Sequence, residues 1–263
     1  MMKKIFSREV VKQSILCTLT TILFSFFLQC ESAAQGFDWQ YSSRLPSSSP
    51  TLFFGGTAKI NYGFHKADIY ELGDEYRCGD YKSGTETGFS ACLASEYWQS
   101  GTLALWCEAG YRYSSVVFSS VTEPEPFKRD GVLYSLTREF EMKSMFHAIE
   151  VQGGIKWRFA PTHFHVLLGV RGTVALKSTV EQTETILTPV EYTQTIVYGQ
   201  APLSSMRILF ITPVAGIGYD AELGRGIYAT PKITVGLPLM SRSSVTSWTN
   251  WDYSAGITIL THF

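Results

Sequence analysis

Beyond residue 34, the sequence lacks any long apolar stretch. No later segment approaches the roughly 18 uninterrupted apolar residues that a membrane-spanning helix needs. Helical membrane spans are therefore excluded after residue 34. If the chain enters a membrane there, it must do so as a closed barrel of strands, which satisfies every backbone hydrogen bond.

The chain also lacks an excess of charge of either sign. It has 22 basic and 23 acidic residues, and residues 1–34 hold four of the basic and two of the acidic ones. The remainder thus carries 18 basic against 21 acidic groups, a net charge of −3. Nucleic-acid partners select strongly basic surfaces, so no such partner is expected.

Cysteine is scarce, and only Cys78, Cys92 and Cys107 follow residue 34. An odd number does not suit a disulfide framework in an exported protein. The strand pattern described below places Cys92 and Cys107 on opposite faces, and the spacing matches no zinc motif. We therefore expect unpaired thiols.

The N-terminus has the three parts of a secretory signal peptide. The basic "MMKKIFSREVVKQ" is followed by the uncharged "SILCTLTTILFSFFLQC" and the small-residue segment "ESAAQG". This predicts a signal peptide over 1–34. A retained anchor and lipid attachment at Cys30 are alternatives, disfavoured by the short apolar run and by the bulky Gln29. Residues 35–51 are rich in Ser and Pro and predict a flexible periplasmic lead.

From residue 52 to the end, apolar and polar residues alternate with a period of two, which indicates strands with two different faces. The connections alternate between short ones, at 99–101, 160–163 and 222–226, and long ones, at about 66–84, 120–131, 184–200 and 241–247. The alternating segments cover residues 53–65, 88–98, 103–113, 149–159, 164–177, 208–219, 227–239 and 250–263.

An even number of strands with alternating connection lengths is typical of outer-membrane barrels, which have short periplasmic turns and long external loops. No charged residue interrupts the apolar rows in mid-strand, and aromatic residues lie at their ends, as at two lipid headgroup levels. We therefore predict an all-β fold over 52–263: an eight-stranded antiparallel up-and-down transmembrane barrel with its apolar faces in lipid. The segment "EQTETILTPVEYTQTIVYGQ" leaves ten strands as an alternative, because it would either lengthen two strands or form an extra hairpin.

The chain ends in "YSAGITILTHF", an alternating strand with an aromatic last residue. This ending resembles the signal by which bacterial outer-membrane barrels are recognised for assembly. The resemblance implies a location in the bacterial outer membrane and two partners, the barrel-assembly machinery and outer-membrane lipid. The residues that would form this assembly signal are Trp251, Tyr253, Ile257, Ile259 and Phe263.

The layout as a whole resembles small bacterial outer-membrane barrels of the OmpA-like and PorT-like superfamily. The segments "AIEVQGGIKWRFAPTHFHVLLGVRG", "FITPVAGIGYDAELGRGIYATPKITVGL" and "YSAGITILTHF" carry the resemblance. These are patterns of strands and turns rather than catalytic motifs. The resemblance therefore implies architecture and location, and no activity.

Charged residues on the polar faces are predicted to point into the lumen. Eight strands leave an interior that side chains just fill, and unpaired buried charges are costly. We therefore expect a salt-bridged polar core that plugs the lumen; an ion path is the alternative. The predicted network consists of Lys59, Glu96, Glu108, Arg112, Glu150, Lys156, Arg158, Arg171, Lys177, Lys232 and Asp252.

No catalytic, cofactor or metal site is predicted. A lipid-modifying barrel needs a Ser nucleophile close to a His base, but neither His65 nor His147 has a Ser two residues away. His163 and His165 share a strand face and would suit a metal, although histidines at a membrane interface are the commoner explanation.

The external connections are therefore the best candidates for function. The segments around "VTEPEPFKRDG" extend two strands well past the 9–11 residues that cross a bilayer, which predicts a hairpin standing above the membrane. The edges of this hairpin would add a strand to a partner, or the hairpin would serve as a rigid stalk. We expect a structural or interaction protein without catalysis. The alternatives are a subunit of a secretion or envelope-assembly machine, a narrow channel and a lipid-modifying enzyme.

Overall fold

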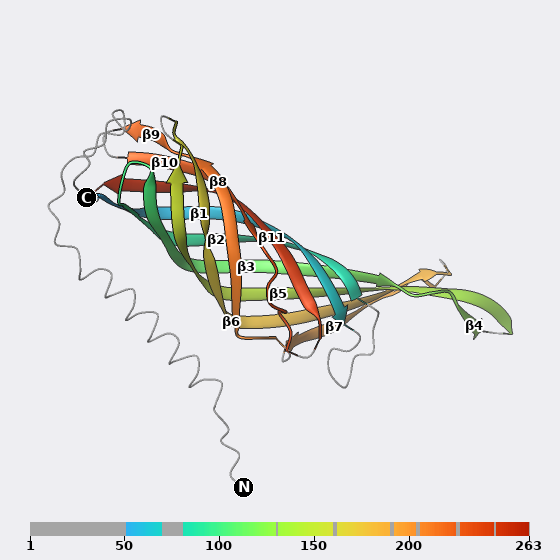
Figure 1. Cartoon of the computed structure of the whole chain (residues 1–263). Helices are drawn as coiled ribbons and strands as arrows, with labels where there is room; N and C mark the ends of the chain where they lie inside the picture. The colour runs from blue at the N-terminus through green and yellow to red at the C-terminus, as the bar shows by residue number, and fades with distance from the viewer. Residues whose placement is uncertain are drawn as a thin grey trace, which may run out of the picture. The chain divides into compact units, whose positions relative to one another are not determined.

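The computed structural model describes residues 51–69, 81–129, 131–159, 162–189, 192–203, 206–224, 227–244 and 246–262 (Figure 1). The predicted signal peptide and the predicted lead lie outside the described residues, except for Thr51, where the first strand begins. Within the described part, no helix is long and apolar enough to cross a membrane.

Eight antiparallel strands form a closed ring, in which each strand pairs with one neighbour on either side. The ring closes because the first strand pairs with the last, from Phe53↔His262 to Ala67↔Trp248. Closure leaves no free edge in the wall, and the predicted eight-stranded barrel is confirmed. The strands are β1 (Thr51–Ile69), β2 (Tyr81–Trp98), β3 (Leu103–Val121), β5 (Val132–Arg158), β6 (Phe164–Thr188), β8 (Leu209–Tyr219), β10 (Ile227–Gly236) and β11 (Trp248–His262).

Three short strands pair onto the ring from outside it. β4 (Glu125–Arg129) pairs with β5, β7 (Thr195–Pro202) with β6, and β9 (Ala221–Gly224) with β10. The β4–β5 hairpin turns at Gly131, whose φ of 83° favours glycine. For residues 181–200 the sequence analysis left eight and ten strands as alternatives. These residues lengthen β6 and add β7 as an extra hairpin, while the ring keeps eight strands.

Alternation gives the wall two faces, as β3 illustrates. Glu108 and Arg112 are buried on its inward face, whereas Leu105 and Tyr111 are exposed on its outward face. Ile60, Leu93, Leu168, Ile217, Ile233 and Ile257 continue the apolar outward rows on other ring strands. The wall is therefore polar inside and apolar outside, as a barrel in lipid must be.

Aromatic residues bound this apolar band at two levels. Trp157, Phe159 and Phe164 lie at the end with the short turns, which is the periplasmic end of such barrels. Towards the other end, Tyr111 and His147 are hydrogen-bonded on the outer surface. Trp157 and His147 are ten positions apart on β5. At about 3.3 Å per residue and a tilt of about 40°, this gives a band roughly 25 Å tall.

Above the outer aromatic level the polarity of the wall reverses. On β5, Phe140, Met142 and Phe146 are buried on the inward face, whereas Glu141 and Lys143 are exposed on the outward face. An apolar interior and a charged exterior are the arrangement of a barrel in water. The upper parts of β3, β5 and β6 therefore extend the barrel out of the membrane, and Figure 1 shows strands that continue past one end.

The predicted long connections are corrected by this extension. β1 continues to Ile69 and β2 starts at Tyr81, so residues 66–69 and 81–84 of the expected 66–84 connection are strand. In the expected connections at 120–131 and 184–200, β4 and β7 form and β6 continues to Thr188. The reason is physical: outside the membrane the strands go on pairing, with the polarity of their two faces exchanged. The predicted tall hairpin around 121–131 is confirmed.

Candidate functional site

The centre of the barrel interior is organised around Glu108 of β3. Its carboxylate accepts hydrogen bonds from Thr57 at 3.2 Å, Lys59 at 3.2 Å and Gln152 at 2.6 Å, and it forms an ion pair with Lys232. Lys59 also lies 2.6 Å from Glu150. Strands from opposite sides of the ring are thereby joined across the lumen, and each charge has a partner, which offsets the cost of burial.

Towards the external end, arginines share two carboxylates. Arg112 donates to Asp252 at 2.9 Å and to Glu86 at 2.9 Å, and Arg171 forms a second ion pair with Asp252. Arg242, from the connection between β10 and β11, lies 2.9 Å from Glu86. The connection is therefore folded back into the barrel mouth and held there by an ion pair.

Towards the periplasmic end, Lys156 lies between Glu96 at 2.9 Å and Asp220 at 2.8 Å. Arg158 donates to Asp220 at 3.0 Å and stacks on the Trp98 ring, 4.1 Å from its centroid. The pairs are charge-assisted and almost wholly buried. This end of the lumen is therefore filled by an ion-pair cluster packed on an aromatic ring.

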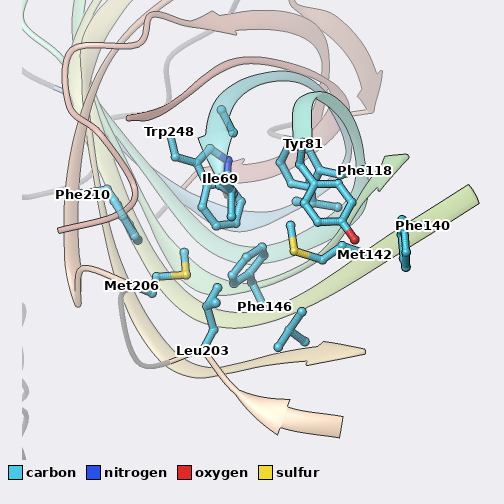
Figure 2. Packing of buried hydrophobic residues seen from close by; sticks show 13 residues of the cluster. Ile69, Tyr81, Phe118, Phe140, Met142, Phe146, Leu203, Met206, Phe210 and Trp248 are labelled. Atoms are coloured by element: carbon cyan, nitrogen blue, oxygen red, sulfur yellow. The ribbon is translucent and has the colours of Figure 1, made fainter. Parts of the chain in front are cut away.

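Apolar clusters close both ends of the network. A periplasmic apolar cluster consists of Phe53, Ala94, Trp98, Ala104, Tyr228 and Leu260. In the external apolar cluster, most of the labelled side chains lie within the curve of the strands, whereas Phe140 lies apart from them (Figure 2). Its labelled members are Ile69, Tyr81, Phe118, Phe140, Met142, Phe146, Leu203, Met206, Phe210 and Trp248.

Ten of the eleven residues predicted for the lumen are buried in the interior, and the structure brings them together in the clusters described above. Lys177 is the exception, and it is exposed. Along β6, Ala175 pairs with Ala148 and Lys177 with His147, so the residue between them has no partner on β5. This β-bulge shifts the alternation by one position, and Lys177 consequently points outward. The prediction for Lys177 was wrong.

Three charges of this ion-pair network escaped the sequence analysis. Glu86 and Asp220 lie just beyond the ends of predicted strands, on the same alternation as Ser90 and Gly218. Continuing the period of two by a few residues would have found both. Arg242 lies in a connection without periodicity, so no sequence signal marked it.

The histidines take structural positions. Trp248 donates its indole N–H to His65 Nδ1 at 2.8 Å, and His65 Nε2 lies 2.8 Å from Glu86. Both ring nitrogens are thus engaged. His165 is buried 3.5 Å from Asp220, and His163 packs edge-on against Tyr219. In the described ranges, no three His, Cys, Asp or Glu side chains are grouped to hold a metal ion.

The two cysteines that the structure describes are unpaired and lie on opposite faces, as expected. Cys92 is buried and Cys107 is half-buried. Cys78 lies outside the described residues. Of the predicted assembly signal, Trp251, Tyr253, Ile257 and Ile259 are exposed on the outward face of β11, and Phe263 lies outside the described residues.

Comparison with known proteins finds only distant structural similarity. No protein-family model and no curated protein sequence matches the chain. Similar solved structures include Ail, the attachment invasion locus protein of Yersinia pestis (9% identity, 79% of this chain and 97% of that one, TM-score 0.29). Others are the outer membrane protease OmpT of Escherichia coli (8%, 84% and 98%, TM-score 0.30) and Neisserial surface protein A (10%, 81% and 99%, TM-score 0.27). At these scores the likeness carries no argument about a role.

The features of the wall itself define the class. A closed ring of eight antiparallel strands carries an apolar outward band between two aromatic levels and a charged, ion-paired interior. Those are the properties of an integral β-barrel of the bacterial outer membrane. The chain is such a barrel, and its strands continue beyond the lipid.

Proposed function

We propose that this barrel is an interaction protein of the outer membrane, without catalysis, and that it binds its partner through the part outside the lipid. One observation carries the proposal: beyond the outer aromatic level, β4 pairs with residues 132–136 of β5, while β6 pairs with β5 from Thr137 on and with β7, and these paired segments are called the extracellular sheet. A sheet of this length is not needed to cross the bilayer, so its role lies outside the membrane.

A groove of about 520 Å³ lies on one face of this extracellular sheet. Phe127, Leu136, Ile186 and Tyr192 supply apolar lining. The side chain of Arg138 also lines the groove, and its ion pair with Glu184 is 3.3 Å long. Apolar walls with a few fixed polar groups are typical of binding sites. The groove therefore supports a binding role for this sheet.

The two edges of the extracellular sheet differ. β4 carries Pro126 and Lys128, residues with which natural proteins protect an exposed edge. β7, with the sequence "TIVYGQAP", has no charge, and its only proline is its last residue. An extended segment of a partner protein would therefore add to β7 rather than to β4.

A channel is the less favoured alternative. In the described residues, ion pairs fill the lumen and an apolar cluster closes each end. We accordingly expect no single-channel current steps in planar bilayers. Regular steps would favour the channel.

The finer assignments are also proposals. We place the chain among OmpA-like and PorT-like barrels, with residues 1–34 as a signal peptide. We expect it to meet the barrel-assembly machinery through β11, outer-membrane lipid through its apolar band, and no nucleic acid. If the partner is a machine component, the chain is a subunit of a secretion or envelope-assembly machine. Release of fatty acid from outer-leaflet lipid would instead favour a lipid-modifying enzyme.

Strand addition to β7 is tested with a variant that changes only its free edge. Ile186 N–H donates to Gln194 C=O, and bonded pairs alternate in an antiparallel ladder. Val197, paired with Thr183 and 62% exposed, therefore directs its N–H away from β6. Val197→Pro removes this donor and leaves the β6 ladder intact, whereas Val197→Thr keeps the donor.

The experiment uses a photo-reactive residue at Thr195 in intact cells. We expect one recurrent crosslinked protein with the wild type and with Val197→Thr, and its loss with Val197→Pro. A photo-reactive residue at Lys128 on β4 serves as the control position and should not capture that protein. Equal capture by Val197→Pro would overturn strand addition at β7.

A further inference from the structure

A cavity of about 40 Å³ lies inside the barrel, between the central ion pairs and the external apolar cluster. Its polar side is lined by Arg112, Arg171, Arg242, Thr173 and Asp252. At roughly 10–15 Å³ per water, the cavity holds about three waters. That space suits one small group such as a phosphate or a carboxylate.

The cavity wall presents hydrogen-bond donors that the protein does not use. Arg171, 2% exposed, donates Nε to Gln152 at 3.0 Å and Nη1 to Asp252, and within the described residues its Nη2 has no acceptor. Arg242 donates Nε to Asn250 at 3.1 Å and lies with Nη2 2.9 Å from Glu86. Arg242 Nη1 likewise has no acceptor among the residues that the structure describes. Arg171 and Arg242 both line the cavity, so an acceptor bound there would receive charge-assisted hydrogen bonds from them.

Positive charge is also in excess at this place. Arg112, Arg171 and Arg242 pair with Asp252 and Glu86, and Arg112 also lies 3.6 Å from Glu150, which Lys59 shares. In the ion-pair network of the lumen as described, the cations outnumber the carboxylates by seven to six; Glu184, a further buried carboxylate, pairs with Arg138 outside this network. The cations are Lys59, Arg112, Lys156, Arg158, Arg171, Lys232 and Arg242, and the carboxylates are Glu86, Glu96, Glu108, Glu150, Asp220 and Asp252. An anion in the cavity would balance the excess, and such an interaction is strong in a low dielectric.

The barrel wall beside this cavity contains a stretch without strand pairing. The ladder between β8 and β10 has five residue pairs, and a hydrogen bond from Leu237 N–H to Pro213 C=O continues it. Beyond this bond, residues 238–240 do not pair with β8. Ile211 and Leu239 line the cavity there, and they are 45% and 69% exposed on the outside.

We propose that this cavity binds one small oxyanion, a phosphate or carboxylate group, through Arg171, Arg242 and the hydroxyl of Thr173. The group is either a free ion or the headgroup of an outer-leaflet lipid whose chain passes between Ile211 and Leu239. This site is independent of partner capture at β7, so either proposal stands if the other fails.

The first test measures binding of inorganic phosphate to the full barrel in a non-ionic detergent, by phosphorus-31 magnetic resonance. Arg242→Gln removes a charge-assisted donor and should weaken binding about tenfold or more. Thr173→Val keeps the side-chain shape and should weaken binding about fivefold. Arg138→Gln removes the same charge outside the cavity, and we expect unchanged affinity.

Each variant is first checked for the gel shift on boiling that marks a folded barrel. If Arg242→Gln does not fold, Thr173→Val decides, because no protein hydrogen bond in the described residues depends on this hydroxyl. The proposal is overturned if folded wild-type barrel shows no saturable phosphate binding. It is also overturned if Thr173→Val binds phosphate as tightly as the wild type does.

The second test distinguishes the two sources of the oxyanion. Phosphatidic acid in the same detergent is titrated against bound inorganic phosphate, with the wild type and with Leu239→Trp, which narrows the route from the lipid. The lipid headgroup is supported if phosphatidic acid displaces phosphate from the wild type and does so less well from Leu239→Trp, while the affinity of Leu239→Trp for inorganic phosphate is unchanged. Saturable phosphate binding without competition supports the free ion.

Discussion

The strand β5 places opposite chemistry on the same face in two regions of the molecule. Inside the lipid band its inward residues include Glu150 and Lys156, whereas above the band they include Met142 and Phe146. Both regions are packed on their inward faces. They differ in what surrounds them, which is hydrocarbon in one region and water in the other.

The surrounding solvent explains the difference. Where water surrounds the wall, burial of apolar side chains provides the driving force, so the inward face is apolar. Where lipid surrounds the wall, moving an apolar side chain from lipid into the interior lowers the free energy little. Hydrogen bonds and packing must therefore hold the strands together. Paired charges then fill the lumen, because the outward face has to be apolar in any case.

Removing the central carboxylate should have the largest effect on stability. Glu108→Gln leaves Lys232 without a carboxylate partner among the described residues. Breaking a buried pair costs about 3–5 kcal/mol, and urea unfolding in lipid vesicles, followed by tryptophan fluorescence, would measure the loss. The control is Glu125→Gln, an exposed partner 3.8 Å from Arg138. Its expected cost is below about 1 kcal/mol, and equal costs for the two variants would contradict the role of the central network.

A charge on the outward face should distinguish the two regions directly. Val151→Lys places an ammonium on the outward face of β5, about midway between the aromatic levels at His147 and Trp157, and should cost about 2–4 kcal/mol near the bilayer midplane. Met145→Lys makes the same change on the outward face of β5, above the outer aromatic level. Its expected effect is within about 0.5 kcal/mol. If both variants unfold at the same urea concentration, the position of the lipid band is wrong.

The sequence predicted the lower region better than the upper one, for a physical reason. Inside the lipid band one polarity holds along each strand, so alternation identified eight strands and interior residues such as Lys59, Glu150 and Asp252. Above the band the polarity of the two faces is exchanged, and segments such as "TREFEMKSMF" alternate in the opposite sense. A prediction that assumes one polarity treats these segments as connections, although they belong to the wall.

Two other features depend on contacts between distant segments. Arg242 enters the interior from a connection without periodicity, and its partner Glu86 is on β2. The bulge in β6 appears only when β5 is paired with it. Neither feature follows from the period of a single strand, so the sequence could not place Arg242 or Lys177.

The smallest expected effect tests this bulge. Lys177→Met removes a charge that the structure places on the outside, so the free energy of unfolding should change by less than about 0.5 kcal/mol. Lys156→Met makes the same change inside and removes the ammonium between Glu96 and Asp220, at a cost of about 3–5 kcal/mol. The two urea midpoints therefore separate an outward from an inward lysine. Similar losses of unfolding free energy in both variants would show that Lys177 points into the lumen, because removing its charge is strongly destabilising only at an interior position.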